Sequence, residues 1–114
     1  MGLDAYGKVK SPEGEVEEIA YWRKHNALHG WMESLYRKKG GTEEFNCIPV
    51  ELNKTDLELL ELVVTSGMLP ETQGFFFGGD TRFCEDYKEQ TLDFIKKARK
   101  YLSQGWEVAY DSWW

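Results

Sequence analysis

Hydrophobic and polar residues alternate along three short stretches of the chain, and hydrophobic residues recur every three or four positions along three longer ones. Alternation places successive side chains on opposite faces of a strand, whereas the longer spacing places them on one face of a helix. Residues 3–10, 45–52 and 106–114 have the first pattern, and residues 20–38, 53–66 and 82–103 have the second. These patterns predict strands and helices in alternation.

Turn and capping residues bound the predicted helices. Gly40 follows a run of cations and ends the first helix, as is usual at a helix C-terminus. Asn53 begins the second, with Asp56 three residues on, and Thr55 with Glu58 offers an alternative capping box. The expected core side of the second helix consists of Leu57, Leu60 and Val64.

The order of elements predicts an α+β fold. Residues 75–77 are three phenylalanines between glycines and predict a further short strand, buried on both faces. Pro49 cannot donate a ladder hydrogen bond, which favours an edge position for its strand. We expect one domain, residues 1–114, built as a two-layer sandwich: a small, mostly antiparallel sheet of about four strands covered by three helices. A small parallel α/β sheet is the rival, but its strands would be richer in valine and isoleucine.

Composition narrows the classes of function. The chain has 114 residues, 20 of them acidic and 14 basic, and its net charge is −6. This balance argues against direct nucleic-acid binding by phosphate neutralisation and suits a protein that engages a basic partner. The sequence shows no apolar run of membrane-spanning length and no signal peptide, so we expect a cytoplasmic protein without a membrane interaction. The pattern does not indicate an oligomeric state.

The stretch from residue 21 to residue 32 concentrates side chains that both stack and hydrogen-bond. At ~100° per residue, Trp22, Asn26, His29 and Glu33 fall on one side of the predicted first helix, beside a core face that includes Tyr21. One hypothesis takes Trp22 as a stacking platform for a nucleotide-like or peptide ligand, with Arg23 as an anion fork. The alternative is structural: Trp22 rests on the sheet edge, and Asn26 and His29 bond to nearby backbone.

The second unusual stretch is residues 73–80. Its glycines would let a ligand approach the backbone, although glycines that flank a core strand explain the same pattern, and Asp80 is also a helix-cap candidate. We hypothesise that the two stretches form one aromatic-lined ligand surface. Its candidate residues are Trp22, Arg23, Asn26, His29, Gln73, Phe76 and Asp80.

Catalytic and metal-binding patterns are weak. His25 and His29 have a spacing that can chelate a metal, but the sequence supplies only two histidines and no glutamate beside the first. Neither Cys47 nor Cys84 has a neighbouring histidine, and no nucleophile elbow is present. We therefore expect binding rather than catalysis, with no metal and no cofactor. A small enzyme that uses His29 as general base is the alternative.

Four motifs resemble a family of small, mostly uncharacterised proteins encoded by tailed phages and prophages. They are Met1-Gly2-Leu3-Asp4-x-Tyr6, Tyr21-Trp22-Arg23-Lys24-x-Asn26-x-x-His29-x-Trp31, Leu69-Pro70-x-Thr72-Gln73-Gly74-Phe75-Phe76-Phe77-Gly78 and Tyr110-x-Ser112-Trp113. Family members carry a serine after the equivalent of Gln73, where this chain continues directly to Gly74, which puts the local turn in doubt. The resemblance implies a phage or prophage origin and no particular activity.

Accessory phage genes of this size often antagonise host defences. The resulting hypothesis is a binding protein in the host bacterial cell that sequesters a small nucleotide-like ligand in the aromatic and polar pocket. The alternative partner is a host protein: an acidic inhibitor would occlude the basic surface of a nucleic-acid-binding protein.

Overall fold

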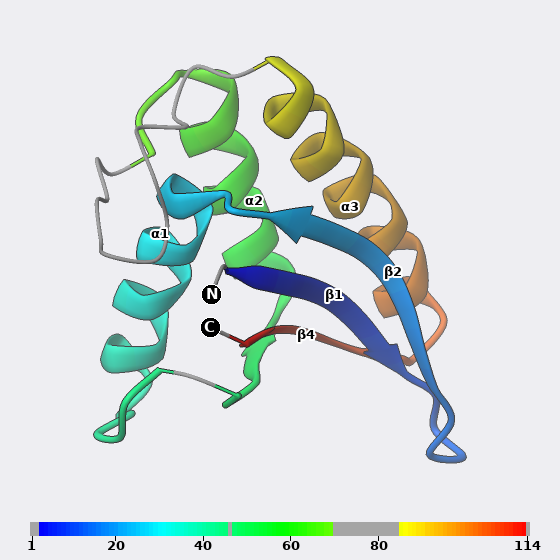
Figure 1. Ribbon diagram of the computed structural model, residues 1–114. Coiled ribbons are helices and arrows are strands. Elements are labelled where there is room, and N and C mark those ends of the chain that lie inside the picture. The colour runs from blue at the N-terminus through cyan, green and yellow to red at the C-terminus, as the bar shows by residue number, and fades with distance from the viewer. Residues whose placement is uncertain (1–2, 46, 70–84, 114) are drawn as a thin grey trace.

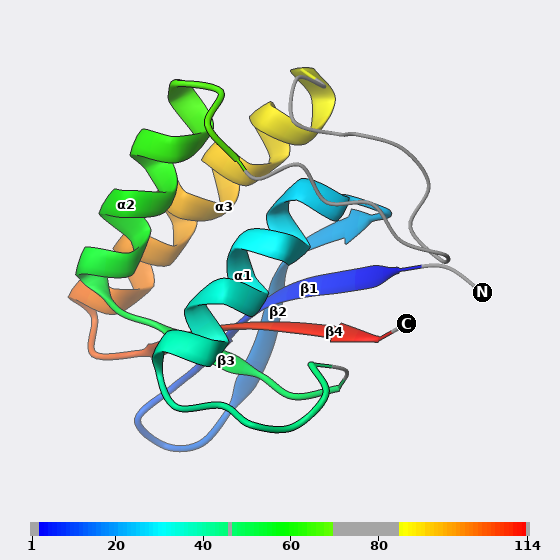
Figure 2. The same ribbon diagram turned by 90° about the vertical axis from the view of Figure 1, so that its left-hand side faces the viewer.

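The computed structural model describes residues 3–45, 47–69 and 85–113 and contains a four-stranded antiparallel sheet with three helices packed on one face (Figures 1 and 2). The elements are, in chain order, β1 (Asp4–Lys10), β2 (Val16–Arg23), α1 (Asn26–Lys38), β3 (Val50–Leu52), α2 (Lys54–Thr65), α3 (Glu85–Ser103) and β4 (Glu107–Trp113). The predicted α+β class is therefore confirmed. No helix among these residues is long and apolar enough to cross a membrane.

The strand order β2-β1-β4-β3 puts the first and last strands side by side in the centre of the sheet. Asp4 pairs with Trp113, so the start of β1 lies beside the end of β4. Among the described strands β3 pairs with β4 and with no other, so it forms one edge of the sheet, which confirms the edge position predicted from Pro49. Alternate residues of β1, β3 and β4 face the helices and are buried, as is Trp22 of β2. These include Ala5, Val9, Trp22, Val50, Leu52, Val108 and Tyr110.

The first helix is shorter than the sequence pattern predicts. Residues 20–23 belong to β2 and not to the helix, because Ala20 to Arg23 pair with β1, and α1 begins only at Asn26. Lys24 separates strand from helix with a φ of 57°, in the left-handed region. Tyr21 therefore projects from the sheet, whereas the predicted helix placed it on the core face. Pairing with β1 overrides the local helical spacing, as tertiary context commonly does.

The strand predicted at residues 45–52 is limited to β3, Val50–Leu52. Its first half is irregular because Cys47 has a φ of 60° and Pro49 cannot donate to a ladder. The Cys47 amide still donates to the Ser112 carbonyl at 2.7 Å, so this segment runs beside the end of β4. The strand predicted at residues 75–77 lies outside the described residues, as does the predicted start of the third helix.

The second helix begins as the sequence predicts. Asn53 caps it: its side chain accepts from the Asp56 amide, and the Asp56 carboxylate accepts from the Asn53 amide. The ammonium of Lys39 donates to Asp56 at 2.7 Å and also to the Glu51 carbonyl, which ties the end of α1 to β3 and α2. The predicted core residues Leu57, Leu60 and Val64 are all buried.

Candidate functional site

Trp22 is a core residue. Its side chain is fully buried, and its indole Nε1 donates to the Thr91 hydroxyl on α3 at 3.1 Å. The edge of its ring meets Phe94 with 5.1 Å between ring centroids. A buried indole needs an acceptor for its N–H, and Thr91 supplies it. These contacts agree with the structural alternative for Trp22 better than with a stacking platform for a ligand.

His29 is also enclosed. It is 2% exposed, its Nδ1 lies 3.0 Å from the Tyr110 hydroxyl, and its ring stacks on Phe45. Burial lowers the pKa of His29 to about 4, because the charged imidazolium loses its hydration. The same burial raises the pKa of Tyr110 well above its ordinary value. At neutral pH both groups are therefore uncharged and form a polar contact between α1 and β4.

His25 precedes α1 and is buried as well. Its ring stacks on Tyr87 with 4.5 Å between centroids and 7° between planes, and burial lowers its pKa to about 4. In the described part of the chain, no group of three or more histidine, cysteine, aspartate or glutamate side chains is arranged to hold a metal ion.

The remaining predicted residues lie on the side of the sheet away from the helices, at the start of α1, and outside the described residues. Arg23 is exposed at the end of β2, opposite Asp4, on the face that points away from Trp22. Asn26 is the first residue of α1, and its side chain is not described. Gln73, Phe76 and Asp80 lie outside the described residues. The structure thus brings Trp22 and His29 to one tyrosine ring, that of Tyr110, but leaves Arg23 on the other face.

A different surface presents aromatic and charged side chains to solvent. No helix or strand of the described residues covers the side of the sheet opposite the helices, which we call the open face. Four rows of residues cross it from strand to strand. They are Arg23, Asp4 and Trp113; Tyr21, Tyr6 and Asp111; Glu18, Lys8, Ala109 and Glu51; and Val16, Lys10 and Glu107.

The first two rows in this list, which we call the upper rows, carry aromatic side chains that contact one another and neighbouring polar groups. The rings of Tyr6 and Tyr21 lie 5.4 Å apart, and the Tyr21 hydroxyl donates to the Asp4 carboxylate at 2.6 Å. That hydrogen bond raises the pKa of Tyr21. Tyr21 nevertheless remains 45% exposed, and Trp113 is 67% exposed. Large aromatic side chains are thus held at the surface of the sheet with area left to contact a partner.

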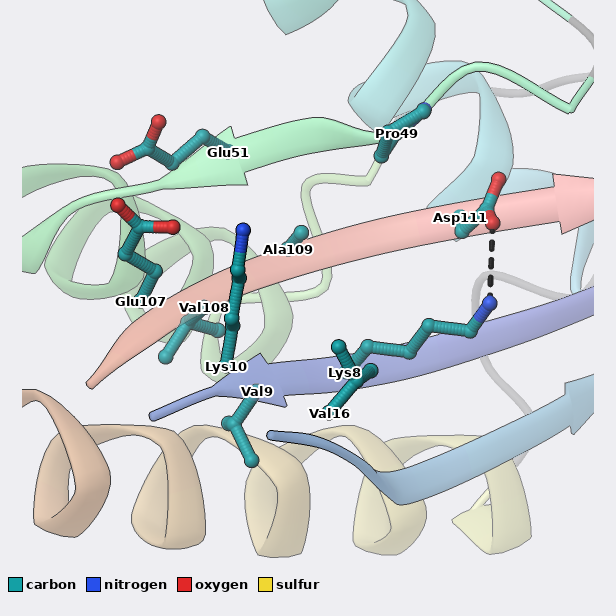
Figure 3. A pocket seen from close by; sticks show the side chains of 10 residues that line it. All are labelled: Lys8, Val9, Lys10, Val16, Pro49, Glu51, Glu107, Val108, Ala109 and Asp111. Atoms are coloured by element: carbon teal, nitrogen blue, oxygen red, sulfur yellow. Dashed lines mark hydrogen bonds and ion pairs between the residues drawn. The ribbon is translucent and has the colours of Figure 1, made fainter. Parts of the chain in front are cut away.

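The last two rows in the list, which we call the lower rows, form most of a hollow of about 420 Å³ (Figure 3). Lys8 and Lys10 rise from β1 into it, whereas Val9 between them points toward α3. The Lys8 ammonium pairs with Asp111 at 3.1 Å. The complete lining is Lys8, Val9, Lys10, Val16, Pro49, Glu51, Glu107, Val108, Ala109 and Asp111.

The strand patterns at residues 3–10 and 106–114 already separate the polar from the apolar side of each strand. They do not reveal that β1 and β4 are neighbours, so the polar sides could not be joined into one face from the sequence. Comparisons with protein-family models, with curated proteins and with solved structures give no match to this chain. The choice of the open face as the candidate site therefore depends on the geometry of the sheet.

Proposed function

We propose that this chain is a phage or prophage accessory protein that antagonises a host defence by binding a host protein with the open face. The observation that supports the proposal is a sheet surface that no described helix or strand covers, on which Tyr21 and Trp113 stay exposed beside Arg23. Tyrosine, tryptophan and arginine are the residues that most often dominate the energy of protein–protein interfaces.

Charge favours a basic partner. The chain carries a net charge of −6, and Glu18, Glu51 and Glu107 stand on the open face. Complementary charge accelerates encounter with a basic surface and disfavours acidic ones. A protein that binds nucleic acid presents such a surface, and an acidic chain seated on it would exclude the nucleic acid. The proposed setting is the cytoplasm of the bacterial host.

The other two hypotheses have less support from the described residues. A nucleotide-like ligand on Trp22 and His29 would have to displace core contacts, because both side chains are enclosed. General-base catalysis by His29 has the same obstacle: its partner at Nδ1 is the buried Tyr110 hydroxyl. A general base must reach the proton that it removes.

Capture from lysate of a susceptible bacterium tests the proposal. The tagged chain should enrich one host protein at low salt and less of it at high salt. Trp113→Ser and Tyr21→Ser should each reduce this enrichment strongly. The first should leave the thermal unfolding midpoint nearly unchanged, since Trp113 is 67% exposed, and the second should lower it slightly, since it removes the hydrogen bond to Asp4. Leu62→Ser is the matched control, because Leu62 is 63% exposed on α2, in the helix layer.

Two results would contradict the proposal. One is a wild-type chain that enriches no host protein at low salt. The other is a captured protein whose enrichment survives both sheet substitutions, or is lost only with Leu62→Ser, which would move the interface to the helix layer.

A further inference from the structure

The hollow in the lower rows of the open face combines an apolar floor with carboxylates. We infer that it seats an arginine side chain of the basic partner. This inference rests on the proposed function and adds to it the chemistry of one contact. The argument has three parts: the floor, the two carboxylates and the shape of the cation.

The floor suits the stem of a long cationic side chain. Val16, Pro49 and Ala109 come from three different segments and line the hollow together (Figure 3). Val16 is 61% exposed, so this apolar surface is left in contact with solvent. Arginine and lysine cover such surface with their methylene groups while their charged ends stay at a polar rim.

Two carboxylates lie at the edge of the hollow. Glu51 on β3 and Glu107 on β4 line the hollow, and within the described part of the chain neither carboxylate makes an ion pair or a hydrogen bond. Asp111 is already engaged by Lys8, which leaves Lys10 as the other ammonium among the residues that line the hollow. The hollow is therefore short of one positive charge.

The geometry points to arginine more than to lysine. The two glutamates belong to adjacent strands, and their carboxylates lie side by side at one end of the hollow (Figure 3). A guanidinium carries five N–H donors in a planar fork and can bond two carboxylates at once, whereas an ammonium acts as a compact point charge. The adjoining aromatic rows, with Tyr21 and Trp113, would hold the rest of the partner.

A titration of the ¹⁵N-labelled full chain tests the inference. The probe is a blocked glycine-serine hexapeptide with one central arginine, and its control is the same peptide with citrulline, which has nearly the same shape without the charge. The arginine peptide should shift the amide signals of Val16, Glu51, Glu107 and Ala109 in a saturable manner. The citrulline peptide should leave them in place, and a lysine peptide should bind several-fold more weakly.

Substitutions locate the binding. Glu51→Gln and Glu107→Gln should each weaken the arginine peptide several-fold, and the double variant should abolish the shifts. Lys10→Gln should strengthen binding, because it removes the competing ammonium. Glu89→Gln, an exposed carboxylate of α3, is the matched control and should change nothing.

The inference fails if the citrulline peptide binds equally well, or if the arginine peptide shifts amides away from the hollow. In either case the proposed function survives provided that Trp113→Ser and Tyr21→Ser still abolish capture of the host protein. Conversely, arginine binding at the hollow together with capture that ignores the sheet substitutions would overturn the proposed function and leave the hollow as an arginine site only.

Discussion

The imidazole of His29 and the phenol of Tyr110 meet in the interior, with 3.0 Å between Nδ1 and the hydroxyl oxygen, and so connect α1 to β4. Burial keeps both groups uncharged at neutral pH, since it lowers the pKa of one and raises the pKa of the other. A polar pair of this kind is stable only while its hydrogen bond is intact.

Mild acid should destabilise the fold. The pKa values of His25 and His29 are lowered to about 4 in the folded chain, from the ordinary 6.5. Between those values the unfolded chain binds protons that the folded chain does not, so stability falls as pH decreases from about 6.5 to about 4. The limiting loss is roughly 3 kcal/mol per imidazole. Urea unfolding at several pH values measures it.

His29→Gln distinguishes the contribution of His29 to the pH dependence of stability from that of His25. The glutamine amide can still bond Tyr110 but does not titrate, so about half of the pH dependence should disappear. A slope between pH 7 and 5 that is unchanged in this variant would show that His29 does not contribute.

The hydroxyl of Thr91 should matter more than its methyl group. Thr91→Val removes the acceptor of the Trp22 indole N–H and leaves that donor buried without a partner, at a cost of about 1–3 kcal/mol. Thr91→Ser keeps the hydroxyl and should cost less. In a Trp22→Phe background the valine substitution should lose most of its effect, and equal costs in the two backgrounds would refute the pairing.

Gly7 should not tolerate a side chain. A Cβ at this position would lie 2.4 Å from the Phe94 ring, in the contact between β1 and α3. Gly7→Ala should therefore destabilise the chain by about 1–3 kcal/mol through overpacking. Adding Phe94→Leu should recover part of the loss, and chemical denaturation measures both. Additive costs would mean that the two positions do not press on each other.

Asp56 combines two roles at the start of α2. Its carboxylate bonds the Asn53 amide and pairs with Lys39. Asp56→Ala should cost about 1–2 kcal/mol, since it removes half of a capping box and one partly buried ion pair. Lys39→Met, which removes the ion pair and the bond to the Glu51 carbonyl but keeps the capping box, should cost less. A larger loss in the lysine variant would place the main contribution in the bond from Lys39 to the Glu51 carbonyl.

The sequence correctly predicted the features that depend only on residues close together in the chain. The capping box of Asn53 and Asp56 needs only four consecutive residues, and it forms as the sequence indicates. Trp22 and Arg23 have helical spacing but belong to a strand, because a partner far away in sequence pairs with them. The same non-local information was missing for the candidate site. Strand order decides which polar rows share a face, and no spacing within one strand encodes it.

The position of β4 in the sheet determines when the sheet can form during synthesis of the chain. Among the described strands, β4 is the one that joins β3 to the β1–β2 hairpin. A nascent chain that stops before Glu107 holds the β1–β2 hairpin and the three-residue β3, but lacks the described strand that pairs with both. A two-stranded hairpin is marginally stable by itself in water. The sheet must therefore close after translation has passed Trp113, and shortened translation products should be substrates for proteases.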